Sequence, residues 1–349
     1  MDHELNFPYT ATQLTEQVNR IPNTYGLLRA LNLFPSAGTI STIVEIRIKD
    51  GVISVLPAKE RGAPGSQADR ATGKTIFLEI PHFPATDVIT PQDLQNMTRI
   101  VGQSKVPVTM DDEMAERLAG LRGNHDITLE YVRMGALKGV IKDGFGNELY
   151  DLYDVFGITK KTVDFKLGDA TTDIIAKCDE VFQHIASNLK GETMGRVEVI
   201  VSPSFFNKFI QHPNVEKYWT SNQIGVAALA QMERQQLGGQ WGRVFEFQNI
   251  LFREYYGAVP VKNPATGQIT SEPLVAAGYG HAYPTGTRDT FRTWFAPADD
   301  IRYVNTPGQE IYVSPYILPH GAGVELKSQS NPLAVCKRPE VLVEVLTSN

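Results

Sequence analysis

The stretch TMDDEMAERLAGLRGNHDITLEYVRMGALKGVIK, Thr109–Lys142, is the longest run of the 349-residue chain with the pattern of one helix. Thr109 and Asp112 have the spacing of a capping box, and the acidic first turn complements the helix dipole. Apolar or bulky residues then recur every three or four positions and form one stripe: Met114, Leu118, Leu121, His125, Leu129, Val132, Ala136 and Val140. We expect this helix to end at the turn signal Asp143-Gly144.

Glycines are the weak points of this helix. Gly120, Gly123, Gly135 and Gly139 are each about 1 kcal/mol less favourable than alanine in a helix. Gly120 and Gly123, together with Asn124, could divide the stretch into two helices. On pattern alone, the plainest interpretation is a long core helix of an ordinary α+β protein.

Composition narrows the class of protein. The length suits one large domain or two to three ordinary ones, and 42% hydrophobic and 21% charged residues are typical of a folded soluble protein. No apolar run is long enough to span a membrane, and the first residues lack a secretory-signal pattern. Cys178 and Cys336 lack metal or redox spacing. A net charge of −6 argues against a dedicated nucleic-acid binder, but not against a container whose inner wall faces nucleic acid.

Two segments before the long helix need a partner surface. Residues 26–35 are apolar and end at a proline, so they require burial on the body of the chain or on a neighbouring subunit. Residues 43–49 alternate like a half-buried strand, Asp50-Gly51 predicts a hairpin, and residues 52–56 the returning strand. A charged loop over 57–74 precedes a further strand over 75–80. Such a ribbon is marginal alone in water.

The rest of the chain mixes helices and strands. Capping signals begin a helix at Thr90, and we expect helices over 171–189, 203–210 and 222–236. Residues 140–156 predict a hairpin that continues into a strand. Further strands are expected over 162–167, 196–201, 244–252, 274–277, 291–295, 310–313 and 316–318. Residues 333–345 read as a long strand with Pro339 inside, hence an edge strand or a bulge.

No motif predicts a catalytic, cofactor-binding or metal-binding residue. The segment 70–75 ends like a phosphate loop, but Ala68 stands where the motif needs glycine. The seven histidines are scattered without metal-ligand spacing. Adjacent carboxylates such as Asp299-Asp300 point apart in extended chain. An apolar arm and a ribbon without a site favour a protein that contacts copies of itself. A soluble enzyme with an unrecognised site is the alternative from another class.

Several pieces of the sequence, in order and spacing, carry a resemblance. They are LRALNLF (28–34), the hairpin pattern over 43–56, ITLEYVRMGALKGVIKDGFGN (127–147), RVEVIVSPSFF (196–206), FREYYG (252–257), WFAPADD (294–300), VNTPGQEIY (304–312) and SQSNPLAVCKRPEVLVEV (328–345). Together they resemble the major capsid protein E family of tailed bacteriophages and prophages, the lambda-like coat proteins. The resemblance covers most of the chain.

The resemblance implies an α+β chain with the tailed-phage major capsid (Hong Kong 97-like) fold. Its parts would be an N-terminal arm (1–38), an extended E-loop ribbon (39–86), a peripheral domain with the spine helix (87–165), an axial domain (166–325) and a C-terminal strand returning to the body (326–349). Contacts between subunits are expected at Leu28, Leu31 and Phe34 of the arm and at Arg61, Arg70 and Lys74 of the loop tip.

The implied function is structural and not enzymatic, without a cofactor. The chain would assemble into hexamers and pentamers of an icosahedral shell around double-stranded DNA, held on the inner face without sequence specificity. Its partners would be itself, a separate scaffold, a portal and a decoration protein, with no membrane. It would reside in the virion, and in the host cytoplasm during assembly. An encapsulin-like bacterial compartment, with a cargo enzyme in place of DNA, is the alternative shell.

Overall fold

The structure, a computed structural model, describes residues 9–21, 26–49, 73–95, 98–101, 104–107, 109–221, 235–237, 240–263 and 266–348. The chain forms two compact units, each made of separate stretches of sequence. The first unit comprises Met1–Thr42, Glu79–Arg133 and Thr293–Ala334, and the second Ile43–Leu78, Met134–Arg292 and Val335–Asn349.

The long helix α4 runs unbroken over Met110–Lys138. Its 29 residues correspond to about 44 Å. The predicted capping box is present, because the Asp112 amide donates to Thr109 Oγ1 at 3.3 Å and the Thr109 amide to Asp112 Oδ2 at 3.1 Å. Gly120 and Gly123 lie where an added Cβ would meet nothing within 4 Å, and they do not interrupt the helix.

The predicted end of this helix at residue 142 is wrong. Gly139 adopts a positive φ of 87°, which ends a helix readily when the residue is glycine. Residues 140–142 then form strand β7 (Val140–Lys142), which pairs with β8 (Glu148–Asp151). A hairpin therefore replaces the last helical turn.

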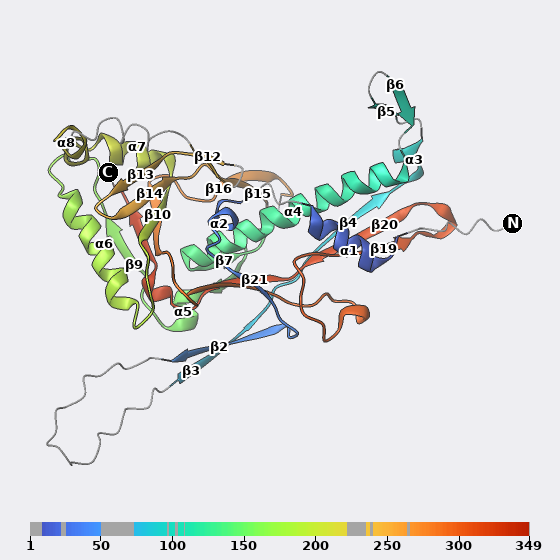
Figure 1. The fold of residues 1–349 in the computed structure, drawn as a ribbon, viewed down its shortest axis with the longest axis horizontal. Helices are drawn as coiled ribbons and strands as arrows, with labels where there is room; N and C mark the ends of the chain where they lie inside the picture. The colour runs from blue at the N-terminus through green and yellow to red at the C-terminus, as the bar shows by residue number, and fades with distance from the viewer. Residues whose placement is uncertain are drawn as a thin grey trace, which may run out of the picture. The chain divides into compact units, whose positions relative to one another are not determined.

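A three-stranded antiparallel sheet organises the first unit. Its order is β19 (Tyr312–Ile317), β20 (Val324–Ser330) and β4 (Phe83–Ile89). Helix α1 (Ala11–Arg20), the first half of α4 and this sheet share one apolar core, made of Leu14, Val18, Ile89, Met114, Leu118, Leu121, Ile311, Val313, Val324 and Leu326. Figure 1 shows α1 beside β19, although the two come from opposite ends of the chain. Thr15 of α1 accepts from the Val313 amide at 3.1 Å and so covers the edge of β19.

The arm continues on the same unit. After α2 (Leu27–Ala30), strand β1 (Ser36–Gly38) pairs in parallel with β18 (Phe291–Phe295). The third strand of this sheet is β21 (Pro332–Cys336). Of the two surfaces that could bury the arm, the body of its own chain is the one that α1, α2 and β1 contact. The capping signals at Thr90 give only a short helix, α3 (Pro91–Leu94).

A six-stranded sheet organises the second unit. Its order is β13 (Val244–Phe247), β14 (Ile250–Glu254), β10 (Val197–Val201), β17 (Tyr279–Pro284), β22 (Val343–Leu346) and β9 (Lys161–Asp164). Helix α7 (Pro203–Gln211) places Phe209 against Phe252 of β14 with ring centroids 4.2 Å apart. Phe165 meets both of these rings edge-on, and Phe205 stacks on Phe209. Helix α6 (Ile174–Asn188) buries the stripe that its sequence predicts, Cys178, Val181 and Ile185 included.

Smaller elements complete the described chain. Two-stranded sheets are formed by β2 (Ile43–Lys49) with β3 (Gly73–Glu79), β5 (Thr98–Val101) with β6 (Ser104–Pro107), β11 (Gln235–Leu237) with β12 (Gln240–Gly242), and β15 (Ala258–Lys262) with β16 (Ile269–Pro273). Short helices are α5 (Leu152–Phe156), α8 (Pro213–Ser221), η1 (Ile301–Tyr303), η2 (Pro319–Gly321) and η3 (Pro339–Val341).

Several predicted elements differ from the structure. The stretch 333–345 is two strands of different sheets, because η3 at Pro339 divides it, and β22 is an interior strand. Residues 152–156 are helical because Asp151 caps them, its side chain accepting from two amides. No strand covers 274–277. Gln235 and Gln236 belong to β11, while residues 52–56 and 222–234 lie outside the described residues. Residues 293–325 belong to the first unit, and their assignment to an axial domain stays a prediction.

Candidate functional site

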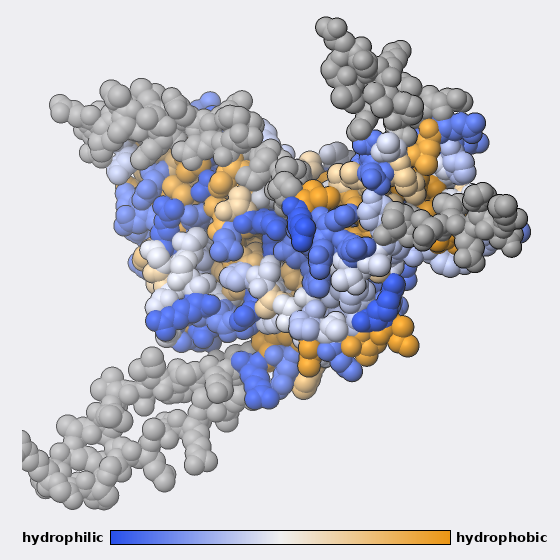
Figure 2. Space-filling model, turned by 45° about the vertical axis from the view of Figure 1, so that its right-hand side comes forward, coloured by the Kyte–Doolittle hydropathy of each residue, from blue (hydrophilic) through white to orange (hydrophobic). Residues whose placement is uncertain are grey.

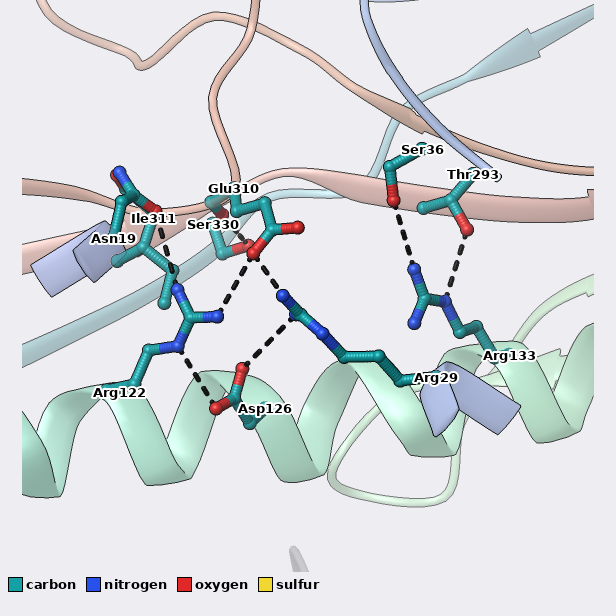
Figure 3. Close-up of polar contacts among 10 residues, drawn as sticks. All are labelled: Asn19, Arg29, Ser36, Arg122, Asp126, Arg133, Thr293, Glu310, Ile311 and Ser330. Atoms are coloured by element: carbon teal, nitrogen blue, oxygen red, sulfur yellow. Dashed lines mark hydrogen bonds and ion pairs between the residues drawn. The ribbon is translucent and has the colours of Figure 1, made fainter. Parts of the chain in front are cut away.

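A buried polar cluster attaches the arm to α4. We call it the arm cluster, and Figure 3 draws most of its members. The arm supplies Asn19, Arg29 and Ser36, α4 supplies Arg122, Asp126, Glu130 and Arg133, and the C-terminal part of the chain supplies Thr293 and Glu310. Three guanidinium groups thus face three carboxylates, so the cluster is electrically balanced.

Arg122 is the centre of the arm cluster. Its side chain is only 3% exposed. Its Nε donates to Asp126 Oδ2 one turn along α4 at 3.0 Å, and its terminal nitrogen donates to Glu310 Oε2 at 3.1 Å. A buried charge needs such partners, since an unpaired ion in a protein interior costs several kcal/mol.

The arm closes the cluster through α2. Arg29 donates to the same Glu310 oxygen at 3.1 Å and lies 4.0 Å from Asp126. The amide of Leu28 donates to Glu130 Oε1 at 2.9 Å. Gly26 adopts a φ of 124°, and a Cβ there would lie 2.8 Å from Glu130 Oε2. Glycine therefore lets the chain turn into α2 directly over this carboxylate.

Arg133 fastens the next piece of the arm. Its guanidinium donates to Ser36 Oγ at 3.1 Å and to Thr293 Oγ1 at 3.2 Å, the two residues that pair between β1 and β18. Burial lowers the pKa of Arg133 to about 10, which leaves the group charged at neutral pH. Burial also raises the pKa of Asp126, while Arg122 opposes this rise.

His125 lies beside the cluster and stays neutral. Its Nε2 is 3.0 Å from Ser328 Oγ of β20, and burial, with a smaller contribution from Arg122, lowers its pKa to about 4. An unfolded histidine has a pKa near 6.5. Below that pH the unfolded chain binds a proton that the folded chain takes up only near pH 4, so stability falls as the pH decreases through this window.

We expect His125→Gln to reduce the acid sensitivity of the protein. His125 accounts for a loss of about 3 kcal/mol of stability between pH 6.5 and pH 4, because a pKa difference of one unit corresponds to about 1.4 kcal/mol. Chemical denaturation at pH 7 and pH 5 measures the effect. The variant should lose clearly less stability than the parent between these two pH values. Equal losses would contradict the prediction.

The arm cluster holds structure together and offers no reactive chemistry. Its guanidinium groups neutralise carboxylates and donate to hydroxyls, and neither kind of contact activates a nucleophile. This cluster was not predicted from the sequence, because the apolar residues of α4 were considered and not Arg122, Asp126 and Arg133, which lie between them. One feature of the sequence could have predicted it. Arg122 and Asp126 are four residues apart, the spacing of an ion pair on one face of a helix, and this helix was expected to be buried.

The residues expected at subunit contacts lie in different places. Leu28 and Phe34 are buried within the chain itself, and Leu31 is half-buried. Lys74 lies in β3, while Arg61 and Arg70 lie outside the described residues. The structure therefore explains the apolar character of Leu28 and Phe34 without a neighbouring subunit, and their role in contacts between subunits stays a prediction.

The ribbon β2–β3 has one buried and one exposed face. Val44, Ile46, Ile76 and Leu78 are buried, as the alternating pattern predicts. On the other face Ile43 is 50% exposed and Phe77 67% exposed. Exposed large apolar residues on a two-stranded ribbon mark a surface suited to contact with another protein.

Other kinds of site are not found in the described part of the chain. Among these residues no group of three or more histidine, cysteine or acidic side chains could hold a metal ion. Burial raises the pKa of the Cys336 thiol to about 12, which makes it unreactive. None of the described helices is both long and apolar enough to cross a membrane.

Comparison with known sequences decides the family. The profile described as phage major capsid protein E matches residues 10–347. The chain belongs to the phage major capsid protein E family. The major capsid protein of Pseudomonas phage KPP10 is 33% identical over 97% of this chain and 96% of the relative. The major capsid protein of Salmonella phage Felix O1 is 31% identical over 95% of this chain and 94% of the relative.

Solved structures confirm the expected α+β capsid fold. The putative capsid protein of a prophage of E. coli CFT073 superposes with a TM-score of 0.60 at 13% identity, covering 97% of this chain and 99% of that one. The mature capsid of bacteriophage PhiM1 gives a TM-score of 0.50 at 14% identity, over 90% of this chain and 85% of that one.

Proposed function

We propose that this chain is the subunit of an icosahedral phage head, in which it forms hexamers and pentamers around double-stranded DNA. The observation that carries the proposal is the match to phage major capsid proteins over nearly the whole length of both chains. The similarity of the fold to that of the mature capsid of bacteriophage PhiM1 supports the same role. The function is structural, and neither catalysis nor a cofactor belongs to it.

The contacts between subunits are proposed at the ribbon. Ile43 and Phe77 present an apolar face, and the charged stretch 57–74 begins between the two strands and ends in the first residues of β3. Each contact can be weak, because many identical contacts act together in a closed shell. Arg61, Arg70 and Lys74 would contact an adjacent subunit, and Leu31 is the arm residue best placed to do so because it is not fully buried.

The other partners follow from the same role. A separate scaffold, a portal and a decoration protein would contact the shell, and DNA would lie against its inner face. A chain with a net charge of −6 suits a wall that does not bind phosphate strongly, since each neutralised phosphate would add affinity and hinder packing and release. The protein would reside in the virion and, during assembly, in the host cytoplasm.

The proposal is tested by assembly of the purified protein. Expressed with its scaffold, the chain should form closed shells in negative-stain electron microscopy and sediment as large particles. A compact monomer at all concentrations, with or without scaffold, would contradict the proposed function.

Deletion of residues 60–73 should abolish closed shells while the subunit stays folded. The deletion removes Arg61 and Arg70, leaves β2 intact and takes from β3 only its first residue, Gly73. Circular dichroism should match that of the parent, and sedimentation should show only subunits or small capsomers. Replacement of the same residues by a glycine-serine linker of equal length is the matched control for chain connectivity, and it should also fail to assemble. Normal shells from either variant would disprove the role of this segment.

A further inference from the structure

The loop 296–311, between β18 and β19, is held in one shape by its own contacts. Asp300 accepts from the Arg302 amide at 3.0 Å, and the Arg302 guanidinium pairs with Asp300 and donates to Ser314 of β19. The ring centroids of Tyr303 and Tyr312 are 4.7 Å apart. At the end of the loop, the Gly308 amide donates to the Thr39 carbonyl at 2.9 Å. The loop is therefore held by contacts with both the arm and β19.

This supported loop presents two aliphatic side chains to water. Ile301, the first residue of η1, is 90% exposed, and Val304, the residue after η1, is 58% exposed. Apolar residues reach the surface at several places in Figure 2, but Ile301 is the most exposed of the large apolar residues described. The contacts of Arg302 and Tyr303 hold the loop so that Ile301 and Val304 cannot turn inward without breaking them.

We propose that Ile301 and Val304 bind a second copy of this chain in the assembled shell. The inference rests on the proposed function and adds a contact that lies in the first unit, apart from the ribbon. In the loop 296–311 Asp300 pairs with Arg302, and Glu310 pairs with Arg29 and Arg122, while Asp299 is exposed. Two of the three acidic side chains of the loop are thus neutralised within the chain, which limits the repulsion between identical loops.

The small area of the contact favours a copy of the chain over an independent partner. A stable binary complex buries about 800 Å² on each partner, and two aliphatic side chains supply only a fraction of that area. Such a contact has a measurable effect where many copies repeat it around symmetry axes, which is the situation in a shell.

The first test compares assembly of the double variant Ile301→Ser/Val304→Ser with that of the parent. Both side chains are exposed, so the variant subunit should keep the parent's circular dichroism and thermal midpoint. Its threshold concentration for shell formation should rise at least tenfold. Ile175→Ser, an exposed isoleucine on α6 in the second unit, is the matched control and should leave the threshold within twofold. Equal thresholds for parent and double variant, or equal losses in both variants, would overturn the inference.

The second test measures protection of the same position directly. Ile301→Cys should react rapidly with a bulky maleimide in free subunits and at least tenfold more slowly in shells, while the buried Cys178 and Cys336 give little background. Equal rates in shells and subunits would overturn the inference. Failure of the parent chain to form any shell would overturn the proposed function. Shells that form normally with Ile301 replaced would overturn only the inference drawn here.

Discussion

Arg122→Leu should destabilise the folded chain by about 3–5 kcal/mol. The substitution leaves the buried carboxylate of Asp126 without its 3.0 Å partner and removes one of the two guanidinium groups that contact Glu310. Removing one member of a buried ion pair has a cost of this size because the remaining charge is desolvated and uncompensated. Chemical denaturation followed by circular dichroism measures the loss, and proteolysis in the arm should accelerate with it.

Arg117→Leu is the matched control on the same helix. Arg117 also pairs with carboxylates, Glu113 at 2.7 Å and Asp87 at 3.4 Å, but its side chain is 32% exposed. Water replaces such partners, so we expect a loss below about 1 kcal/mol. The double variant Arg122→Leu/Asp126→Leu should regain part of the stability, because it leaves one fewer unpaired charge. If Arg117→Leu and Arg122→Leu lose similar amounts of stability, the burial of Arg122 does not explain its contribution, and the prediction is wrong.

Gly139→Ala should destabilise the protein by about 2–4 kcal/mol. Gly139 has a φ of 87°, which an alanine adopts at a cost of roughly 1–2 kcal/mol. Its Cβ would also lie 2.2 Å from the buried Tyr153 ring, and overpacking of this kind costs typically 1–3 kcal/mol. The shift in the denaturation midpoint measures the sum.

Gly120→Ala is the same chemical change within α4, with the opposite expected sign. Nothing lies within 4 Å of an added Cβ at Gly120, and its backbone is helical. Alanine should therefore stabilise the protein by up to about 1 kcal/mol. A loss at position 120 equal to that at 139 would mean that space and backbone conformation do not distinguish the two glycines.

Periodicity predicted the helices well because their signals are local. The capping box at Thr109, the stripe of α6 and the alternation of β2 all reappear in the structure. The end of α4 was misplaced because Gly139 was considered a weak point within the helix, whereas the Tyr153 ring occupies the space that a side chain would need there. The division of residues 333–345 between two sheets depends on strands far away in sequence, which periodicity does not reveal.

The arm cluster was not predictable from the same signals. Arg29, Asp126 and Glu310 are distant in sequence, and only the fold brings them together. The apolar residues of the arm suggested burial, and both the chain itself and a neighbour offered it. The pattern does not distinguish the two surfaces, and the burial of Leu28 and Phe34 within the chain depends on contacts between residues that are distant in sequence.

The parallel pairing of Ser36–Gly38 with Thr293–Phe295 also bears on synthesis of the protein. A ribosome makes about 250 further residues after the first of these strands before its partner exists. Closure of so long a loop is slow compared with local folding. Docking of β1 is therefore a late step, which can begin only once residues 293–295 have been made.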